Sequence, residues 1–496
     1  MAKSWATFGV DLHLEPSGPG VRRGLTDALR EAVRTGRLAP GTRLPSSRSL
    51  AADLGIARNT VADAYADLVA EGWLTARQGS GTSVARGAAA AGAPDAGVPA
   101  SGVPAVGAPG AEVPAAGAPV TAGPRLSGRP AYNLIPGTPD LAAFPRAQWL
   151  KAARRALATA PNEAFDYGDP RGRVELRTAL AGYLARARGV RTGPDRVLIC
   201  SGISHGLRIL AAVLRARGAD TVAVESYGLH VHWDLLADAG LRTVPLPFDE
   251  RGTDPGRLAD QQAVLLTPAH QFPMGGVLHR DRRAAVVDWA RRTGGVVVED
   301  DYDGEFRYDR QPVGALQGLD PDHVVHMGTA SKSLAPGLRL AWLVLPPGLL
   351  GEALRAKGRV DSSGVLDQLT LAEFIVSGAY DRHVRAARLR YRRRRDALVA
   401  ELARRAPHIH ATGIAAGLHI VLRLPPGTEQ ATLRAAAWQD LAVHGLRLYR
   451  HPQATTRPPD ALVVGYGTPP DHAWSGALDA LCAALPDLPE KTETVS

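Results

Sequence analysis

Cysteine is nearly absent from this sequence: among its 496 residues, Cys200 and Cys482 are the only two. Two cysteines exclude a disulfide framework and a metal site built from several thiolates. No stretch approaches the run of about 20 apolar residues that spans a membrane, and the first residues lack the apolar run of a signal peptide. We therefore expect a cytoplasmic protein without membrane attachment, and we assign no metal site.

The chain is basic. Lysine and arginine outnumber aspartate and glutamate, 58 to 49, which gives a formal net charge of +9 at pH 7. A basic balance favours a polyanionic partner such as a nucleic acid. The length is too great for one ordinary hydrophobic core and predicts two or three domains.

Residues 86–130 mark the clearest boundary in the chain. They are almost all Ala, Gly, Pro and Val, with no aromatic residue and very little charge. Such a segment cannot bury enough apolar surface to offset the entropy lost on ordering. We interpret it as a flexible linker rather than a small packed domain. It separates an N-terminal domain, residues 15–85, from a larger domain, residues 131–490.

The N-terminal segment predicts three helices and a short turn between the last two. A first helix covers residues 21–35, and a turn rich in Gly and Pro follows. Ser46 is expected to cap a second helix that ends at Gly55. A third helix starts near Ala57 and keeps helical apolar spacing up to Ala70. Helix, short turn and helix together predict a helix-turn-helix.

The basic residues of this segment point to DNA. Residues 21–86 contain ten arginines, six acidic residues and no lysine. The third predicted helix presents Arg58, Asn59 and Thr60 at its N-terminal end, where a recognition helix meets base edges and phosphates. The alternative is a helical protein-interaction module with a solvated basic face.

A wing is predicted next to the helices, because residues 73–75 and 82–84 can pair as two short strands. With the motifs Arg43-Leu44-Pro45-Ser46-Ser47-Arg48 and Arg58-Asn59-Thr60-Val61, the stretch resembles the GntR-type winged helix. Ala57 stands where that family usually has Ser. The resemblance implies DNA contacts from Arg48, Arg58, Asn59, Thr60 and Gly79, to which we add Arg43, Ser46, Arg77 and Gln78.

The C-terminal part alternates apolar strands with amphipathic helical segments. Strands are predicted at residues 196–200, 221–224, 263–266 and 295–298, each followed by a turn signal. This alternation indicates an α/β domain with a large, mostly parallel sheet. In such sheets ligands bind at the carboxyl ends of the strands.

Polar residues gather at these predicted strand ends. Asp300 ends a buried strand, and Tyr302 follows it; the acidic residues there could also form a solvated loop or a metal site. The turn at Ser201, Gly202 and Ile203 opens a helix, which favours phosphate binding. Tyr227 follows the next strand, where its ring could stack on a ligand.

Lys332 is the candidate for covalent chemistry. Lysine is scarce in this chain, and Lys332 sits between two serines in the motif Ser331-Lys332-Ser333. Ser331 and Arg339 are placed to reach one phosphate, which suits the fork geometry of arginine. A lysine amine, a carboxylate for a pyridinium nitrogen, a phosphate cup and a stacking ring are what pyridoxal phosphate (PLP) requires of a protein.

Further motifs make the family resemblance specific. They include Tyr167-Gly168-Asp169-Pro170-Arg171-Gly172 and Thr267-Pro268-Ala269-His270-Gln271-Phe272-Pro273. The C-terminal part resembles a fold-type I aminotransferase with a large sheet domain and a smaller α+β domain. The whole chain resembles the MocR family of transcription regulators.

The resemblance implies a role for each candidate residue. Lys332 forms the Schiff base with PLP, Asp300 pairs with the pyridinium, and Tyr302 meets the phenolic oxygen. Ser201, Gly202, Ser331 and Arg339 surround the phosphate, and we place Ile203 with them. Because this fold builds its sites at a dimer interface, we expect a homodimer in which Tyr167 reaches the partner's site.

Departures from the aminotransferase pattern shape the functional prediction. Val463 stands where aminotransferases carry the arginine that binds the substrate carboxylate, although Arg447 or Arg450 could serve instead. Leu229 replaces the arginine that gamma-aminobutyrate-responsive members carry, and Met274 replaces a small hydroxyl residue. We therefore expect a DNA-binding regulator, not an enzyme, that senses PLP and controls its synthesis, as in the PdxR-like branch. The alternatives are a regulator that senses an amino compound through an external aldimine with PLP, and an active aminotransferase with a fused DNA-binding domain.

Overall fold

The computed structural model of the protein describes residues 21–34, 38, 41–77, 81–85, 130–308 and 313–487. The predicted linker, residues 86–130, lies outside this part of the chain except for its last residue. Gln78 and Gly79 of the predicted wing also lie outside it, as does Thr35, which we expected at the end of the first helix.

The N-terminal part is a winged helix. It consists of α1 (Val21–Arg34), α2 (Ser47–Leu54), α3 (Arg58–Ala70) and the antiparallel pair β1 (Leu74–Arg77) and β2 (Gly81–Val84). The predicted caps of α2 are confirmed: the Ser46 hydroxyl accepts a hydrogen bond from the Ser49 amide, and Gly55 ends the helix with φ of 65°. Leu25, Leu50 and Leu68 are fully buried between the three helices.

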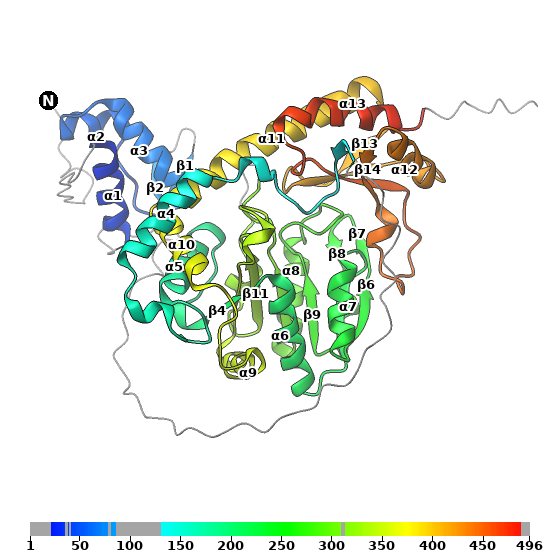
Figure 1. Ribbon diagram of the computed structural model, residues 1–496, viewed down its shortest axis with the longest axis horizontal. Helices are drawn as coiled ribbons and strands as arrows, with labels where there is room; N and C mark the ends of the chain where they lie inside the picture. The colour runs from blue at the N-terminus through cyan, green and yellow to red at the C-terminus, as the bar shows by residue number, and fades with distance from the viewer. Residues whose placement is uncertain are drawn as a thin grey trace, which may run out of the picture.

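A seven-stranded sheet forms the centre of the larger part (Figure 1). The strand order is β4-β12-β11-β10-β9-β5-β6, and β12 is antiparallel to both of its neighbours while the other pairs are parallel. The predicted mixed, mostly parallel sheet is thereby confirmed. The strands are β4 (Val197–Cys200), β5 (Thr221–Glu225), β6 (Arg242–Leu246), β9 (Ala263–Leu266), β10 (Val296–Asp300), β11 (Val324–Thr329) and β12 (Ala341–Val344).

Helices cover both faces of this sheet. One face packs against α6 (Ile203–Ala216), α7 (His230–Asp238) and α9 (Pro347–Lys357), and the other against α5 (Val174–Arg188), α8 (Arg280–Thr293) and α10 (Val365–Val376). Successive strand residues point to opposite faces. In β4, for example, Leu198 and Cys200 join one core, while Val197 and Ile199 join the other. Burial on both faces explains why these strands read as continuous apolar runs.

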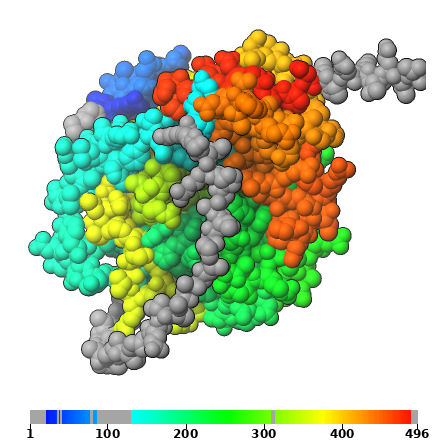
Figure 2. All heavy atoms as spheres, turned by 45° about the vertical axis from the view of Figure 1, so that its right-hand side comes forward, coloured from blue at the N-terminus to red at the C-terminus, as the bar shows by residue number. Residues whose placement is uncertain are grey.

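A smaller α+β part lies over the carboxyl-end side of the sheet (Figures 1 and 2). Its antiparallel sheet has the order β13-β14-β17-β16. Its elements are α11 (Ala379–Arg405), β13 (His410–Thr412), β14 (His419–Arg423), α12 (Glu429–Trp438), β16 (His444–Gly445), β17 (Ala461–Gly465) and α13 (Trp474–Ala484). The remaining helix is α4 (Arg146–Thr159), and the remaining strands are β3 (Tyr132–Asn133), which pairs with β15 (Leu441–Ala442), and β7 (Phe248–Asp249), which pairs with β8 (Gly252–Thr253). Across the described residues, none of the helices is both long and apolar enough to cross a membrane.

Candidate functional site

A cavity of about 280 Å³ lies between the carboxyl ends of the central strands and the smaller part. Residues at the ends of four parallel strands line it: Glu225 at the end of β5, Thr267 directly after β9, Asp300 at the end of β10 and Thr329 at the end of β11. This is the position that open α/β sheets use for ligands. Of the residues predicted for the cofactor, seven line this cavity: Ile203, Tyr227, Asp300, Tyr302, Ser331, Lys332 and Arg339.

Lys332 points into the cavity from the loop after β11. Its Nζ donates a hydrogen bond to the Gly137 carbonyl at 2.5 Å. Burial lowers the pKa of the Lys332 ammonium, and the carboxylates of Asp300 and Asp303 oppose this shift only in part. A lowered pKa increases the share of neutral amine, which is the form that attacks a carbonyl carbon.

Asp300 has the properties expected of a partner for a pyridinium. Burial raises the pKa of its carboxyl to about 7. Its buried Oδ1 has no hydrogen-bond partner among the described residues. A buried carboxylate oxygen without a partner is costly, so a cationic N–H in the cavity would satisfy it. The residues present therefore fit PLP.

The pKa of Asp300 leads to a prediction for Asp300→Asn. In protein stripped of cofactor, this carboxyl titrates near 3.8 when unfolded and near 7 when folded. Its contribution to stability is therefore complete below the lower value and is lost as the pH rises through 7. Since asparagine does not titrate, the free energy of unfolding of the variant should rise relative to wild type by a few kcal/mol between pH 4 and pH 8. Denaturant unfolding at both pH values measures this difference; an equal difference at both would contradict it.

Arg339 lies beside Ser201 and Gly202, two other residues that we predict to surround the phosphate. Gly202 precedes α6 with φ of 92°, and a Cβ there would overlap the Arg339 guanidinium. Arg339 also donates to the Ser201 carbonyl at 2.8 Å. The Ser201 hydroxyl lies 3.1 Å from that of Ser362. Ser201 thus holds Arg339 at the start of α6 and Gly202 leaves room for its guanidinium, although neither lines the cavity.

Tyr302 is positioned by a neighbour that the sequence did not single out. Its hydroxyl lies 3.1 Å from His270 Nδ1, which is 2.8 Å from the Asp303 carboxylate. His419 of β14 lies next to His270, and its Nε2 is 3.0 Å from the Pro273 carbonyl. Ligand atoms of His270, Asp303 and His419 all lie within 4.8 Å of one another. Hydrogen bonds already account for these side chains, so they do not require a metal.

Two histidines in the cavity wall were missed by sequence reasoning. Burial lowers the pKa of His232 to about 4 and that of His419 to about 3, so both are neutral at physiological pH. No local sequence pattern indicated either residue. His419 in particular reaches the cavity only through the packing of the smaller part on the sheet. Arg339 is the only arginine among the described residues that line the cavity.

The expected position of a carboxylate-binding arginine is apolar. Val463 of β17 is fully buried in a cluster with Tyr227, Phe272, Met274 and Tyr449. The two arginines considered as substitutes are engaged elsewhere. Arg447 is paired with Asp460 at 2.7 Å, and Arg450 donates to backbone carbonyls; neither lines the cavity.

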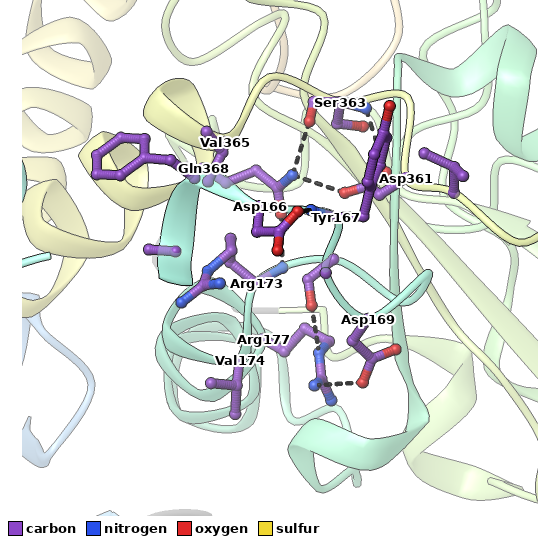
Figure 3. A pocket seen from close by; sticks show the side chains of 15 residues that line it. Asp166, Tyr167, Asp169, Arg173, Val174, Arg177, Asp361, Ser363, Val365 and Gln368 are labelled. Atoms are coloured by element: carbon purple, nitrogen blue, oxygen red, sulfur yellow. Dashed lines mark hydrogen bonds and ion pairs between the residues drawn. The ribbon is translucent and has the colours of Figure 1, made fainter. Parts of the chain in front are cut away.

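Tyr167 lies away from the cavity of its own chain. Its side chain is 87% exposed. Figure 3 shows it in the wall of a separate hollow, together with Arg173, Asp361 and Gln368. The predicted placement of Tyr167 beside the cofactor therefore requires a second subunit.

The described residues predicted to contact DNA come from α2, α3, the wing and the turn before α2. Arg58 and Asn59 are exposed there, and Thr60 is half-buried. Arg43, Ser46 and Arg48 are also exposed, and the Arg43 guanidinium lies beside Gly81 of the wing. Ala57 gives α3 no side-chain cap, and the Thr60 amide donates instead to the Ala57 carbonyl at 3.0 Å. Arg77 is the last residue of β1.

Comparison with known proteins agrees with this architecture. The family described as bacterial regulatory proteins, gntR family, matches residues 22–84, and aminotransferase class I and II matches residues 133–453. The fold of the larger part is similar to kynurenine aminotransferase of Pyrococcus horikoshii, with a TM-score of 0.64 and 23% identity over 72% of this chain and 91% of that one.

Curated relatives extend over both parts. The pyridoxine biosynthesis transcriptional regulator PdxR of Corynebacterium glutamicum is 31% identical over 92% of this chain and 95% of its own. The probable rhizopine catabolism regulatory protein MocR of Rhizobium meliloti is 34% identical over 84% of each chain. The chain therefore belongs to the MocR family of DNA-binding transcription regulators, in which a GntR-type winged helix is joined to a PLP-binding domain of the aminotransferase fold.

Proposed function

We propose that this regulator senses PLP itself and controls the synthesis of PLP, and that it is not a working aminotransferase. One observation carries the proposal: the cavity presents the groups that PLP needs, while Val463 and its apolar neighbours occupy the position of the carboxylate-binding arginine. A ligand that is PLP alone needs no such arginine. The relative named PdxR, a pyridoxine biosynthesis regulator, supports the same conclusion.

In this proposal each residue around the cavity has one task. Lys332 would hold the cofactor covalently, and Asp300 would accept a hydrogen bond from the pyridinium N–H. Tyr302 would donate to the phenolic oxygen, and Tyr227 would pack on the ring. PLP supplies an electron-withdrawing ring conjugated to the bound nitrogen. The phosphate group is held by Ser331, Arg339 and the start of α6 at Ile203, with Ser201 and Gly202 behind them.

We further propose a cytoplasmic homodimer. Apolar side chains are exposed around the hollow that contains Tyr167, among them Phe165, Val174 and Val360, each about half exposed. A second copy would cover this apolar surface and bring the partner's Tyr167 to the cavity. Two subunits would also present two winged helices to paired half-sites on DNA.

The test of this function in the cell is transcription. We expect that deleting the gene changes transcript levels of PLP-synthesis genes, and that supplying a vitamin B6 precursor no longer alters them in the deletion strain. A strain carrying Lys332→Ala should behave like the deletion strain in its response to the precursor. Normal regulation in the deletion strain would contradict the proposal.

We also predict that the purified holoprotein transaminates common amino acids at a negligible rate. A substrate whose carboxylate is not anchored is poorly oriented, and loss of orientation can remove several kcal/mol of rate acceleration. Half-reactions followed by the absorbance of the bound cofactor measure this with alanine, glutamate and aspartate. Rapid, steady turnover with any of them would favour the aminotransferase alternative.

A further inference from the structure

The winged helix packs directly against the larger part of its own chain (Figure 1), where it contacts α5 and the start of α11. Arg186 of α5 makes the central contact. Its Nη1 donates to the Glu71 carbonyl at 2.7 Å, and its guanidinium lies 5.8 Å from the centre of the Trp73 ring. Glu71 and Trp73 follow α3 immediately, so this contact holds the end of the recognition helix.

An ion pair and a close backbone approach add to this interface. Arg385 of α11 pairs with Asp67 of α3 at 3.1 Å. At Gly72, with φ of 81°, a Cβ would lie 2.7 Å from the Arg186 carbonyl. The interface therefore depends on the backbone approach that a glycine permits. It leaves the DNA-reading end of α3 open, because Arg58 lies at the opposite end of the helix, about 20 Å away at 1.5 Å per residue.

The first turn of α11 links this interface to the cofactor loop. Asp381 pairs with Arg186 at 3.1 Å. On either side of Asp381 in the sequence, Tyr380 donates to the Ser333 hydroxyl at 2.8 Å, and His383 Nε2 lies 2.7 Å from the Ser333 carbonyl. Ser333 is the residue next to Lys332. The path from the cofactor lysine to the end of the recognition helix is thus an unbroken series of contacts, in which Tyr380 is buried and the Asp381 side chain is 9% exposed.

We propose that the first turn of α11, together with Arg186, couples the cofactor site to the winged helix. The proposal rests on the proposed function, in which PLP binding at Lys332 is the signal. Attachment of PLP at Lys332 Nζ competes with the hydrogen bond from this atom to the Gly137 carbonyl. A shift of the loop at Ser333 is passed to Tyr380 and His383, and then through Asp381 and Arg186 to Glu71 and Trp73.

Hydrogen exchange of the full-length protein, with and without saturating PLP, tests this coupling without DNA. The amides of Glu71, Gly72 and Trp73 donate to backbone carbonyls of α3, so their exchange reports how readily the end of α3 that contacts Arg186 opens. We expect PLP to change their exchange rates in wild type by about fivefold or more, the size of a typical coupling between sites. In Tyr380→Phe and in Arg186→Gln the change should fall below about twofold, while PLP affinity stays within about twofold of wild type.

Arg382→Gln is the matched control. It removes one arginine from the same turn of α11, but Arg382 is exposed and makes only a bond to the Ser377 carbonyl among the described residues. This variant should respond to PLP like wild type. Exchange rates in wild type that do not change with PLP, or a full response to PLP in both Tyr380→Phe and Arg186→Gln, would overturn the coupling. If the segment responds as expected but DNA affinity never changes with PLP, the coupling stands and the proposed function fails.

Discussion

Lys332→Ala is expected to abolish the response of DNA binding to PLP. Without the amine, the cofactor is held only by the phosphate cup, Asp300 and ring contacts, and we expect its Kd to rise by about two orders of magnitude, ~2.8 kcal/mol. DNA affinity measured without PLP should be unchanged, since Lys332 lies in the cavity and the reading residues lie on the winged helix. Cofactor absorbance and a DNA titration measure the two effects.

Lys151→Ala serves as the control for this prediction. Lys151 is exposed on α4 and does not line the cavity, so the variant loses the same charge without touching the cofactor. It should bind PLP and respond to it like wild type. If Lys332→Ala retained the full PLP response of DNA binding, covalent attachment at this lysine would not be the signal.

The second large effect is expected at the start of the recognition helix. Arg58→Ala and Asn59→Ala should each weaken operator binding by about 1–3 kcal/mol, or roughly 5- to 150-fold, if their side chains reach base edges. Both are exposed at the N-terminal end of α3, and Arg58 makes no ion pair with any described residue. Binding titrations on operator and on unrelated DNA, at fixed salt, separate loss of specificity from loss of charge.

Arg34→Ala provides the comparison for Arg58→Ala. Arg34 is exposed at the end of α1, and its guanidinium pairs with Glu31 at 2.6 Å. The variant loses the same charge, yet we expect operator affinity within about twofold of wild type, because the charge lies outside the predicted reading surface. Equal losses in both variants would show that the arginines act only through net charge.

Local chemistry explains what could be predicted from the sequence. Ser46 and Gly55 mark helix ends through their own caps, which depend on neighbours within a few residues. The strand that ends at Asp300 could be predicted because a strand buried on both faces needs a continuous apolar run. The loop that carries Lys332 was found because its serines and Arg339 match a family motif.

The contacts that sequence reasoning missed join distant segments. His419 comes to the cavity from β14, more than one hundred residues after Asp300. The contact between Arg186 and Glu71 joins two segments that lie on opposite sides of the predicted linker in the sequence. The partners of Arg447 and Arg450 could not be predicted from the sequence either, since they are set by the packing of the smaller part. Periodicity and spacing carry no information on such pairs.

The most direct test of the central claim is the affinity of the purified protein for the intergenic region upstream of its own gene, at fixed salt, with and without PLP. Salt must be constant because phosphate contacts make DNA affinity strongly dependent on it. We predict that PLP alone changes the affinity by about fivefold or more, or shifts the footprint, with no added amine. Identical binding curves and footprints in the two conditions would contradict PLP sensing and favour a regulator that needs an amino compound as its signal.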